Sequence, residues 1–242
     1  VLRGILDERG RHGQFLMLGS ASPDMLRQSS ETLAGRIGYL ELTPFLLSEV
    51  ARVRTSPRIM HGHWLRGGFP RSYLATSEES SREWREEFIR TFLERDLRQL
   101  GVTLPPESMR RFWQMAAHVH GQLWNASKIA QSLGVSQPTA QSYLRVLESA
   151  FMLRVIPPLE TNLKKRLVKT AKVYLRDSGI LHALLHIENE DDLLGHPGYG
   201  SSWEGYAIEQ VLGVVGANWD ACFYRTSAGA ECDLVLQKGR RR

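Results

Sequence analysis

The stretch SKIAQSLGVSQPTAQSYLRVL, residues 127–147, gives the clearest structural signal in the chain. Ile129 and Leu133 lie at helical spacing, and Gly134 is typical of the residue that ends a helix. After a tight turn, Pro138 favours the first turn of a second helix. Two short helices joined by such a turn predict a helix-turn-helix.

The second helix has two chemically different faces. Its apolar positions are expected to face the first helix: Ala140, Tyr143, Leu144 and Leu147. Its polar positions, with Lys128 of the first helix, carry groups that suit phosphates and base edges, so we take them as candidate DNA contacts: Gln137, Thr139, Gln141, Ser142 and Arg145. A solvated helix face has the same composition, and this alternative stays open.

Two β-like runs follow, at residues 151–156 and 171–175. Between them lies the basic run Lys164-Lys165-Arg166, which could reach a DNA backbone. Helices followed by a two-stranded basic ribbon suggest a winged helix. Winged helices also serve as protein-contact modules, so the sequence leaves both partners open.

The positive charge of the chain is concentrated around this region. The formal charge is +5 and the isoelectric point is near 9.4. Residues 125–177 contain nine Lys and Arg against three acids, so the rest of the chain is close to neutral. Such a local surplus suits a nucleic-acid partner.

The N-terminal part predicts an α/β arrangement. Phe15-Leu16-Met17-Leu18, closed by Gly19, indicates a strand buried on both faces of a parallel sheet. Residues 37–42 indicate a second strand and residues 44–53 a helix, after an opening helix in residues 1–14. Since parallel strands need neighbours, we expect the rest of the sheet to lie outside this sequence.

A long helix is predicted over residues 81–100, with an apolar face and a face of alternating charges. Gly101 ends it, and residues 103–106 form a short linker that we take as a domain boundary. Another helix is expected to begin at Pro106.

The C-terminal part contains three acidic residues that could lie close together. A helix is predicted over residues 202–212, with its buried side formed by Trp203, Tyr206, Ala207 and Val211. A hairpin follows, and strand alternation puts Glu231 and Asp233 on one face. With Glu204 they form a candidate metal site for Mg²⁺, although a solvated acidic face is the simpler reading. Metal-dependent nucleases usually add Glu-x-Lys on the next strand, which this sequence lacks, so an active nuclease is not expected.

Composition narrows the class of protein. An apolar fraction of 42% and a charged fraction of 24% are ordinary for a globular protein, and no apolar run is long enough to span a membrane. Cys222 and Cys232 have no metal-ligand spacing, and His61 and His63 have no third ligand nearby. We therefore expect a cytoplasmic protein without a membrane partner.

Several motifs together resemble a widespread prokaryotic family of AAA-type ATPases with an uncharacterised C-terminal domain. Their order and spacing cover almost the whole chain: Leu16 to Ser22, Leu33-Ala34-Gly35-Arg36, Leu42-Thr43-Pro44-Phe45, Gly67-Gly68-Phe69-Pro70, Phe92 to Leu97, Tyr174 to Gly179, Trp203-Glu204 and Glu231-Cys232-Asp233.

The resemblance implies a mixed α/β and α+β architecture. Residues 1–102 would be the C-terminal part of a P-loop ATPase domain with a helical extension, and residues 106–180 a winged helix-turn-helix. Residues 181–242 would be part of a restriction-endonuclease-like α/β region, of the PD-(D/E)xK kind. Ser20 matches the polar sensor beside the γ-phosphate, and Arg36 is a candidate sensor or finger arginine, with a surface or ion-paired arginine as the equal alternative. Glu204 and Asp233 match the nuclease-like acidic positions.

One departure from the family matters most. No Gly-x-x-x-x-Gly-Lys-[Ser/Thr] occurs in the sequence. We expect ATP and Mg²⁺ to be cofactors of a longer protein of which this chain is a piece, and we do not expect this chain alone to bind ATP tightly or hydrolyse it. The alternative is a non-catalytic winged-helix protein that binds DNA or another protein. Self-association is left open.

Overall fold

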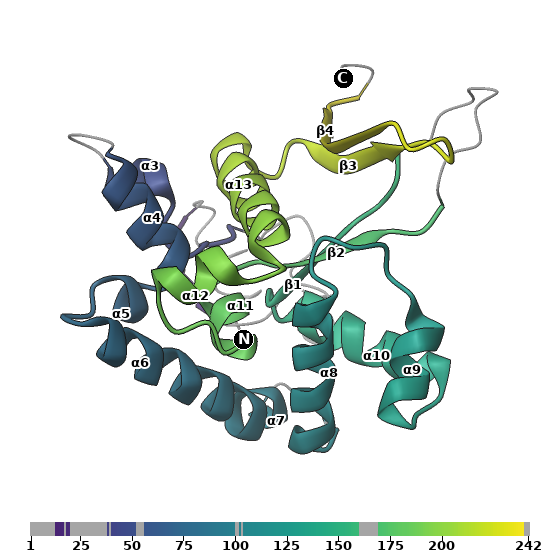
Figure 1. Cartoon of the computed structure of the whole chain (residues 1–242), viewed down its shortest axis with the longest axis horizontal. Helices are drawn as coiled ribbons and strands as arrows, with labels where there is room; N and C mark the ends of the chain where they lie inside the picture. Colours follow the sequence, from purple (N-terminus) through teal and green to yellow (C-terminus); the bar gives the residue numbers. More distant parts are fainter. Residues whose placement is uncertain are drawn as a thin grey trace.

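The computed structural model describes residues 13–16, 18–19, 38, 40–51, 56–99, 102, 104–159 and 169–239 (Figure 1). The first part of this described chain is helical. It contains α3 (Leu47–Val50), α4 (Pro57–Arg66), α5 (Pro70–Tyr73), α6 (Glu78–Thr91), a π-helical segment (Phe92–Asp96) and α7 (Leu97–Gln99).

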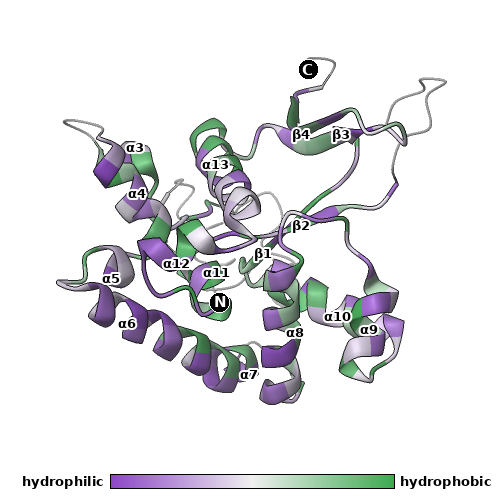
Figure 2. Cartoon of the chain, in the orientation of Figure 1, coloured by the Kyte–Doolittle hydropathy of each residue, from purple (hydrophilic) through white to green (hydrophobic). Residues whose placement is uncertain are grey.

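The predicted long helix is confirmed as the run from α6 to α7, with one irregular turn. Ser77 caps α6 by accepting a hydrogen bond from the Ser80 backbone N–H. The negative charges of Glu78 and Glu79 in the first turn interact favourably with the positive end of the helix dipole. Figure 2 shows α6 as largely hydrophilic, and Ile89 is among its few buried residues. The helix therefore covers the core with one narrow face.

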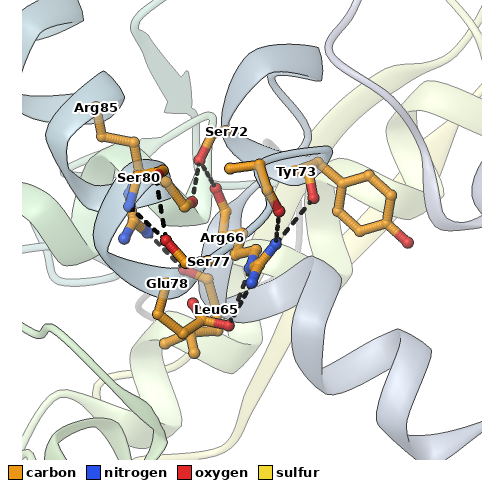
Figure 3. Close-up of polar contacts among 10 residues, drawn as sticks. Leu65, Arg66, Ser72, Tyr73, Ser77, Glu78, Ser80 and Arg85 are labelled. Carbon is orange, nitrogen blue, oxygen red and sulfur yellow. Dashed lines mark hydrogen bonds and ion pairs between the residues drawn. The ribbon is translucent and has the colours of Figure 1, made fainter.

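The junction of α4, α5 and α6 is held by two arginines (Figure 3). Arg66 donates to the Glu78 carboxylate from Nη2 at 2.7 Å and to the Ala75 carbonyl from Nη1 at 2.7 Å. Arg85 is fully buried and donates to the Leu65 carbonyl at 2.8 Å. Burial lowers the pKa of Arg85, and the negative charge of Asp177 opposes this shift.

The middle of the chain confirms the predicted order of helices and strands. It contains α8 (Pro106–His118), α9 (Ala126–Leu133), α10 (Gln137–Ser149), β1 (Leu153–Ile156) and β2 (Lys172–Leu175). The two strands pair antiparallel, with Leu153 opposite Leu175 and Ile156 opposite Lys172. This unit occupies the right-hand side of Figure 1, with β1 and β2 near the centre.

The last part contains α11 (Ser178–Leu184), α12 (Glu190–Gly195), α13 (Tyr199–Val215), β3 (Asp220–Arg225) and β4 (Glu231–Gln237). The predicted hairpin is confirmed, because β3 and β4 pair antiparallel with an irregularity between Cys222 and Tyr224. The two cysteines form no disulfide with each other; Cys222 is buried and Cys232 is exposed.

The main apolar core contains side chains from both sides of residues 103–105, where the sequence predicts a linker. It joins side chains of α6 and the π-helical segment to α8, the helix-turn-helix, β1, β2 and α11; its largest members include Phe92, Phe112, Trp113, Tyr143 and Leu147. A smaller cluster around Phe223 connects β1 and β2 to α13 and the hairpin.

The two predicted N-terminal strands are wrong for the described residues of those stretches. Phe15, Leu16 and Leu18 are in no strand, and Leu16 is 84% exposed. Leu40 and Leu42 are also outside any strand and almost fully exposed. No described strand lies alongside to pair with them, and an apolar strand without neighbours has no reason to form. The described part of the helix predicted at 44–53 contains α3, with residues 44–46 before it outside the helix, and residues 52–53 lie outside the described residues. The opening helix also lies outside the described residues, apart from its last two positions.

The predicted buried face of α13 is partly wrong. Trp203 and Val211 are 37% and 41% exposed, whereas Tyr206 is buried as expected. The buried positions are Ser202, Gly205, Tyr206, Ile208, Glu209 and Leu212. Because the helix is apolar on most sides, its sequence pattern did not identify the face that packs. No helix in the described chain is long and apolar enough to cross a membrane.

Candidate functional site

The helix-turn-helix is built by local capping. The Asn125 side chain accepts a hydrogen bond from the Lys128 N–H at 2.9 Å, and Gly134 ends α9 in a left-handed conformation with φ of 68°. Ser136 then caps α10 by accepting from the Thr139 N–H at 3.3 Å. These caps set where the two helices begin and end, and the buried apolar side chains of both helices pack them into the main core.

The candidate DNA-contacting residues that the structure describes all lie on this unit, and none of them is buried. Gln137 and Arg145 of α10 and Lys128 of α9 are exposed, and the others are half-exposed: Thr139, Gln141 and Ser142. The apolar residues of α10 are buried against the core, as predicted. Within the described chain, neither Lys128 nor Arg145 forms an ion pair, so both charges are available to a partner.

Part of the basic surplus is used internally. Arg154, Lys172 and Arg176 are among the nine basic residues of positions 125–177, yet each forms ion pairs with carboxylates of the same chain. Lys164, Lys165 and Arg166 lie outside the described residues. The charge available to a partner is therefore smaller than the sequence count indicates.

The three predicted metal-ligand candidates do come together, but around a lysine. The Lys172 ammonium lies 3.2 Å from Glu204 of α13 and 2.8 Å from each of Glu231 and Asp233 of β4. Tyr174 also donates to the Glu204 carboxylate at 2.5 Å. An open pocket of about 570 Å³ lies over this cluster, with Arg225 on its wall.

This arrangement does not fit a metal ion. Within the described part of the chain, no group of three or more His, Cys, Asp or Glu residues is arranged to hold one. Burial alone would lower the pKa of Lys172, but its bonds to Asp233, Glu231 and Glu204 raise that pKa to about 12. Lys172 is thus a permanent cation in the space that a metal ion between these carboxylates would need. Its place at the start of β2, in a run of buried residues, was the missed signal in the sequence.

A second charged cluster lies farther along α13. Glu209, which is 9% exposed, accepts two hydrogen bonds from Arg154 of β1, one of them at 2.9 Å from Nη2. Arg176, next to the end of β2, donates to the same carboxylate at 3.3 Å and pairs with Glu41. Sequence reasoning did not identify this cluster, because its members are far apart in the chain.

Comparison with known proteins finds two relatives that align with almost the whole chain. Uncharacterized protein Mb2031c of Mycobacterium bovis and Uncharacterized protein Rv2008c of Mycobacterium tuberculosis are each 43% identical to this chain over 237 residues. The aligned region is 98% of this chain and 52% of each relative, so the chain spans about half the length of these relatives. No solved structure matches the chain.

Two family models match successive parts of the sequence. Residues 1–51 match an AAA domain, which relates the chain to AAA-type P-loop proteins. Residues 58–191, more than half of the chain, match the domain of unknown function DUF8612. The chain belongs to the DUF8612 family.

Two glycine-containing motifs of the DUF8612 region meet in space. The Asp177 carboxylate accepts hydrogen bonds from the Gly68 N–H at 2.8 Å and the Ile180 N–H at 2.9 Å. It therefore caps α11 and ties the segment that follows α4 to the start of α11. A Cβ at Gly67 would lie 2.2 Å from the Asp177 carboxylate, and one at Gly179 would lie 2.1 Å from the Arg66 carbonyl oxygen. These motifs, at residues 67–70 and 174–179, therefore form a structural contact, which the sequence alone did not reveal.

The candidate nucleotide-sensing residues, Ser20 and Arg36, lie outside the described residues. Both belong to the region that matches the AAA domain. Their roles stay predictions.

Proposed function

We propose that this chain is the DNA-associated part of an AAA-type ATPase, with the helix-turn-helix of α9 and α10 as its DNA-contacting unit. The observation that carries this proposal is the exposed polar face of α10, with Arg145 and nearby Lys128 unpaired among the described residues. The match of residues 1–51 to an AAA domain supports nucleotide use by the whole protein.

The order of elements supports a winged helix. Three helices, α8 to α10, are followed by a two-stranded antiparallel hairpin, and the sequence places Lys164-Lys165-Arg166 between its strands. In helix-turn-helix proteins the second helix enters the major groove, and its first residues contact base edges. Here those residues are Gln137, Thr139 and Gln141, while Lys128, Arg145 and the basic run would contact phosphates.

The carboxylate cluster around Lys172 has a different role in this proposal. With the lysine ammonium among Glu204, Glu231 and Asp233, the cluster holds β2 against α13 and β4 and supplies no step of phosphodiester hydrolysis. ATP hydrolysis belongs to the whole protein, because the phosphate-binding sequence motif is absent from these 242 residues.

Binding to a fluorescent DNA duplex, followed by anisotropy over a range of salt concentrations, tests the DNA contact. The double substitution Lys128→Glu and Arg145→Glu should weaken binding by roughly tenfold or more and reduce the salt slope by about two, one for each lost phosphate contact. The matched control is Arg58→Glu on α4, an exposed arginine away from the helix-turn-helix, which should change affinity little.

Equal affinities for the double variant and the natural sequence would remove the helix-turn-helix as the DNA contact. Absence of measurable binding by the natural sequence at low salt would favour the second candidate function, a protein-contact module. The alternative has one supporting observation, the internal pairing of Arg154, Lys172 and Arg176, which reduces the free positive charge.

A further inference from the structure

Helix α13 lies between the segment 41–47 and the hairpin formed by β1 and β2 (Figure 1). The segment belongs to the region that matches an AAA domain, whereas the hairpin belongs to DUF8612. The segment also touches the start of DUF8612 directly, since the Phe45 N–H donates to the Gly68 carbonyl at 2.8 Å, and α13 provides a second link between the two regions.

The segment is anchored to α13 at successive turns. The Leu47 N–H donates to the Gln210 side chain at 2.7 Å. Leu46 packs so closely on Gly213 that a Cβ there would lie 2.4 Å from the Leu46 side chain. His63 connects the Phe45 carbonyl at 2.8 Å to the Tyr206 hydroxyl at 2.9 Å. Tyr206, Gln210 and Gly213 follow the i, i+4, i+7 spacing of one helix face.

The hairpin contacts the same helix through charge and apolar packing. Ile208 and Leu212 of α13 pack with Ile156 of β1 and Tyr174 of β2. Glu209 binds the guanidinium groups of Arg154 and Arg176. Glu204 of α13 also binds Lys172 and Tyr174 of β2, so two carboxylates of α13 hold the hairpin, and Glu209 is the more buried of them.

The segment adds a negative charge to this cluster. Glu209 binds both arginines, Glu148 of α10 acts on Arg154, and Glu41 of the segment pairs with Arg176. Ion pairs in a poorly solvated site are costly to break, so docking of the segment and the position of the hairpin arginines favour each other.

We infer that α13 couples the two regions: displacement of the segment 41–47 loosens the β1–β2 hairpin through Glu41, Arg176 and Glu209. The base of the proposed wing then responds to movement in the AAA-like region. The effect on DNA affinity rests on the proposed function, but the coupling between segment and hairpin does not.

Hydrogen exchange of the whole 242-residue chain tests the coupling without DNA. Glu41 is 43% exposed, so Glu41→Gln should leave the protein folded. We expect amide exchange in β1 and β2 to accelerate by about threefold, the effect of a lost ion pair, while α8 is unchanged. The matched control is Glu190→Gln on α12, an exposed carboxylate paired with His61, which should not affect the hairpin.

The possible results separate the two proposals. Unchanged exchange in β1 and β2, or equal acceleration in all helices, would overturn the coupling whatever the DNA result. Acceleration confined to the hairpin supports it, even where the chain fails to bind DNA and the proposed function falls. With DNA binding present, Glu41→Gln should also change affinity by a few-fold, although Glu41 is not a DNA-contacting candidate.

Discussion

At the scale of single residues, close backbone approaches explain glycines whose role the sequence left open. Gly179 packs directly against the Arg66 carbonyl, and Gly67 adopts φ of 76° beside the Asp177 carboxylate. The peptide groups there approach too closely for any side chain. Asp177 completes the contact by accepting hydrogen bonds from both segments. The end of α4 and the start of α11 are thereby joined through backbone groups and one short side chain, which makes the contact rigid.

The substitution Gly179→Ala should destabilise the protein by about 2 kcal/mol or more, because the new methyl group would force α4 and α11 apart. Gly195→Ala is the matched control, since it lies in α12 with nothing within 4 Å of the added Cβ. The control should change the free energy of unfolding by less than about 0.5 kcal/mol. Urea unfolding followed by circular dichroism measures both, and equal stabilities of the two variants would contradict the close contact.

At the scale of elements, helices were predictable and isolated strands were not. The helix predictions for α8, α9 and α10 are confirmed, because caps and apolar spacing act within a few residues. The strands predicted at 15–18 and 37–42 are wrong for their described residues, since strand formation depends on neighbours that local sequence does not specify. The gathering of Glu204 with Glu231 and Asp233 was anticipated from side-chain alternation, but Lys172 was counted as surface charge.

Replacing that lysine tests how the elements are held. Lys172→Met removes the cation shared by α13 and β4, so three carboxylates repel one another and stability should fall by about 2 kcal/mol, less than for a fully buried pair because Asp233 is 46% exposed. Millimolar Ca²⁺ should restore part of this loss, since the freed carboxylates become oxygen ligands. Chemical unfolding with and without Ca²⁺ measures the effect.

The exposed Lys128→Met is the control for that experiment. It keeps the carboxylate cluster intact and should show neither the loss of stability nor the rescue by Ca²⁺. Stabilisation of the natural sequence by Ca²⁺ to the same extent as the Lys172→Met variant would mean that the lysine does not exclude a metal ion.

At the scale of the whole molecule, buried histidines connect regions that are far apart in the sequence. His182 of α11 bonds the Leu65 carbonyl of α4 at 2.9 Å and the Ser202 hydroxyl of α13 at 2.7 Å. His120, just after α8, accepts from the Leu175 N–H of β2 at 2.9 Å and lies against Gly205 of α13. Both histidines are therefore built into the contacts that join α13 to the DUF8612 region.

These histidines should make stability fall on acidification. Burial lowers the pKa of His120 to about 3 and of His182 to about 4, against 6.5 in the unfolded chain. Between these values and pH 6.5 the unfolded state binds more protons, so acidification favours unfolding throughout this window. Asp177 and Glu148 act in the opposite sense, since burial raises their pKa values, whereas the lowered pKa of buried His63 acts in the same sense as the two histidines.

From pH 7.5 to pH 5, each histidine should cost about 2 kcal/mol of unfolding free energy, and urea midpoints across this range measure the sum. The substitution His182→Gln should reduce the slope of stability against pH by about half, even where it lowers stability at every pH, because glutamine does not titrate. A slope that is flat in the natural sequence would show that the histidines are protonated in the folded protein. If His182→Gln leaves the slope unchanged, the pH dependence of stability comes from other groups. The contact between His182 and α13 would then not be sensitive to protonation.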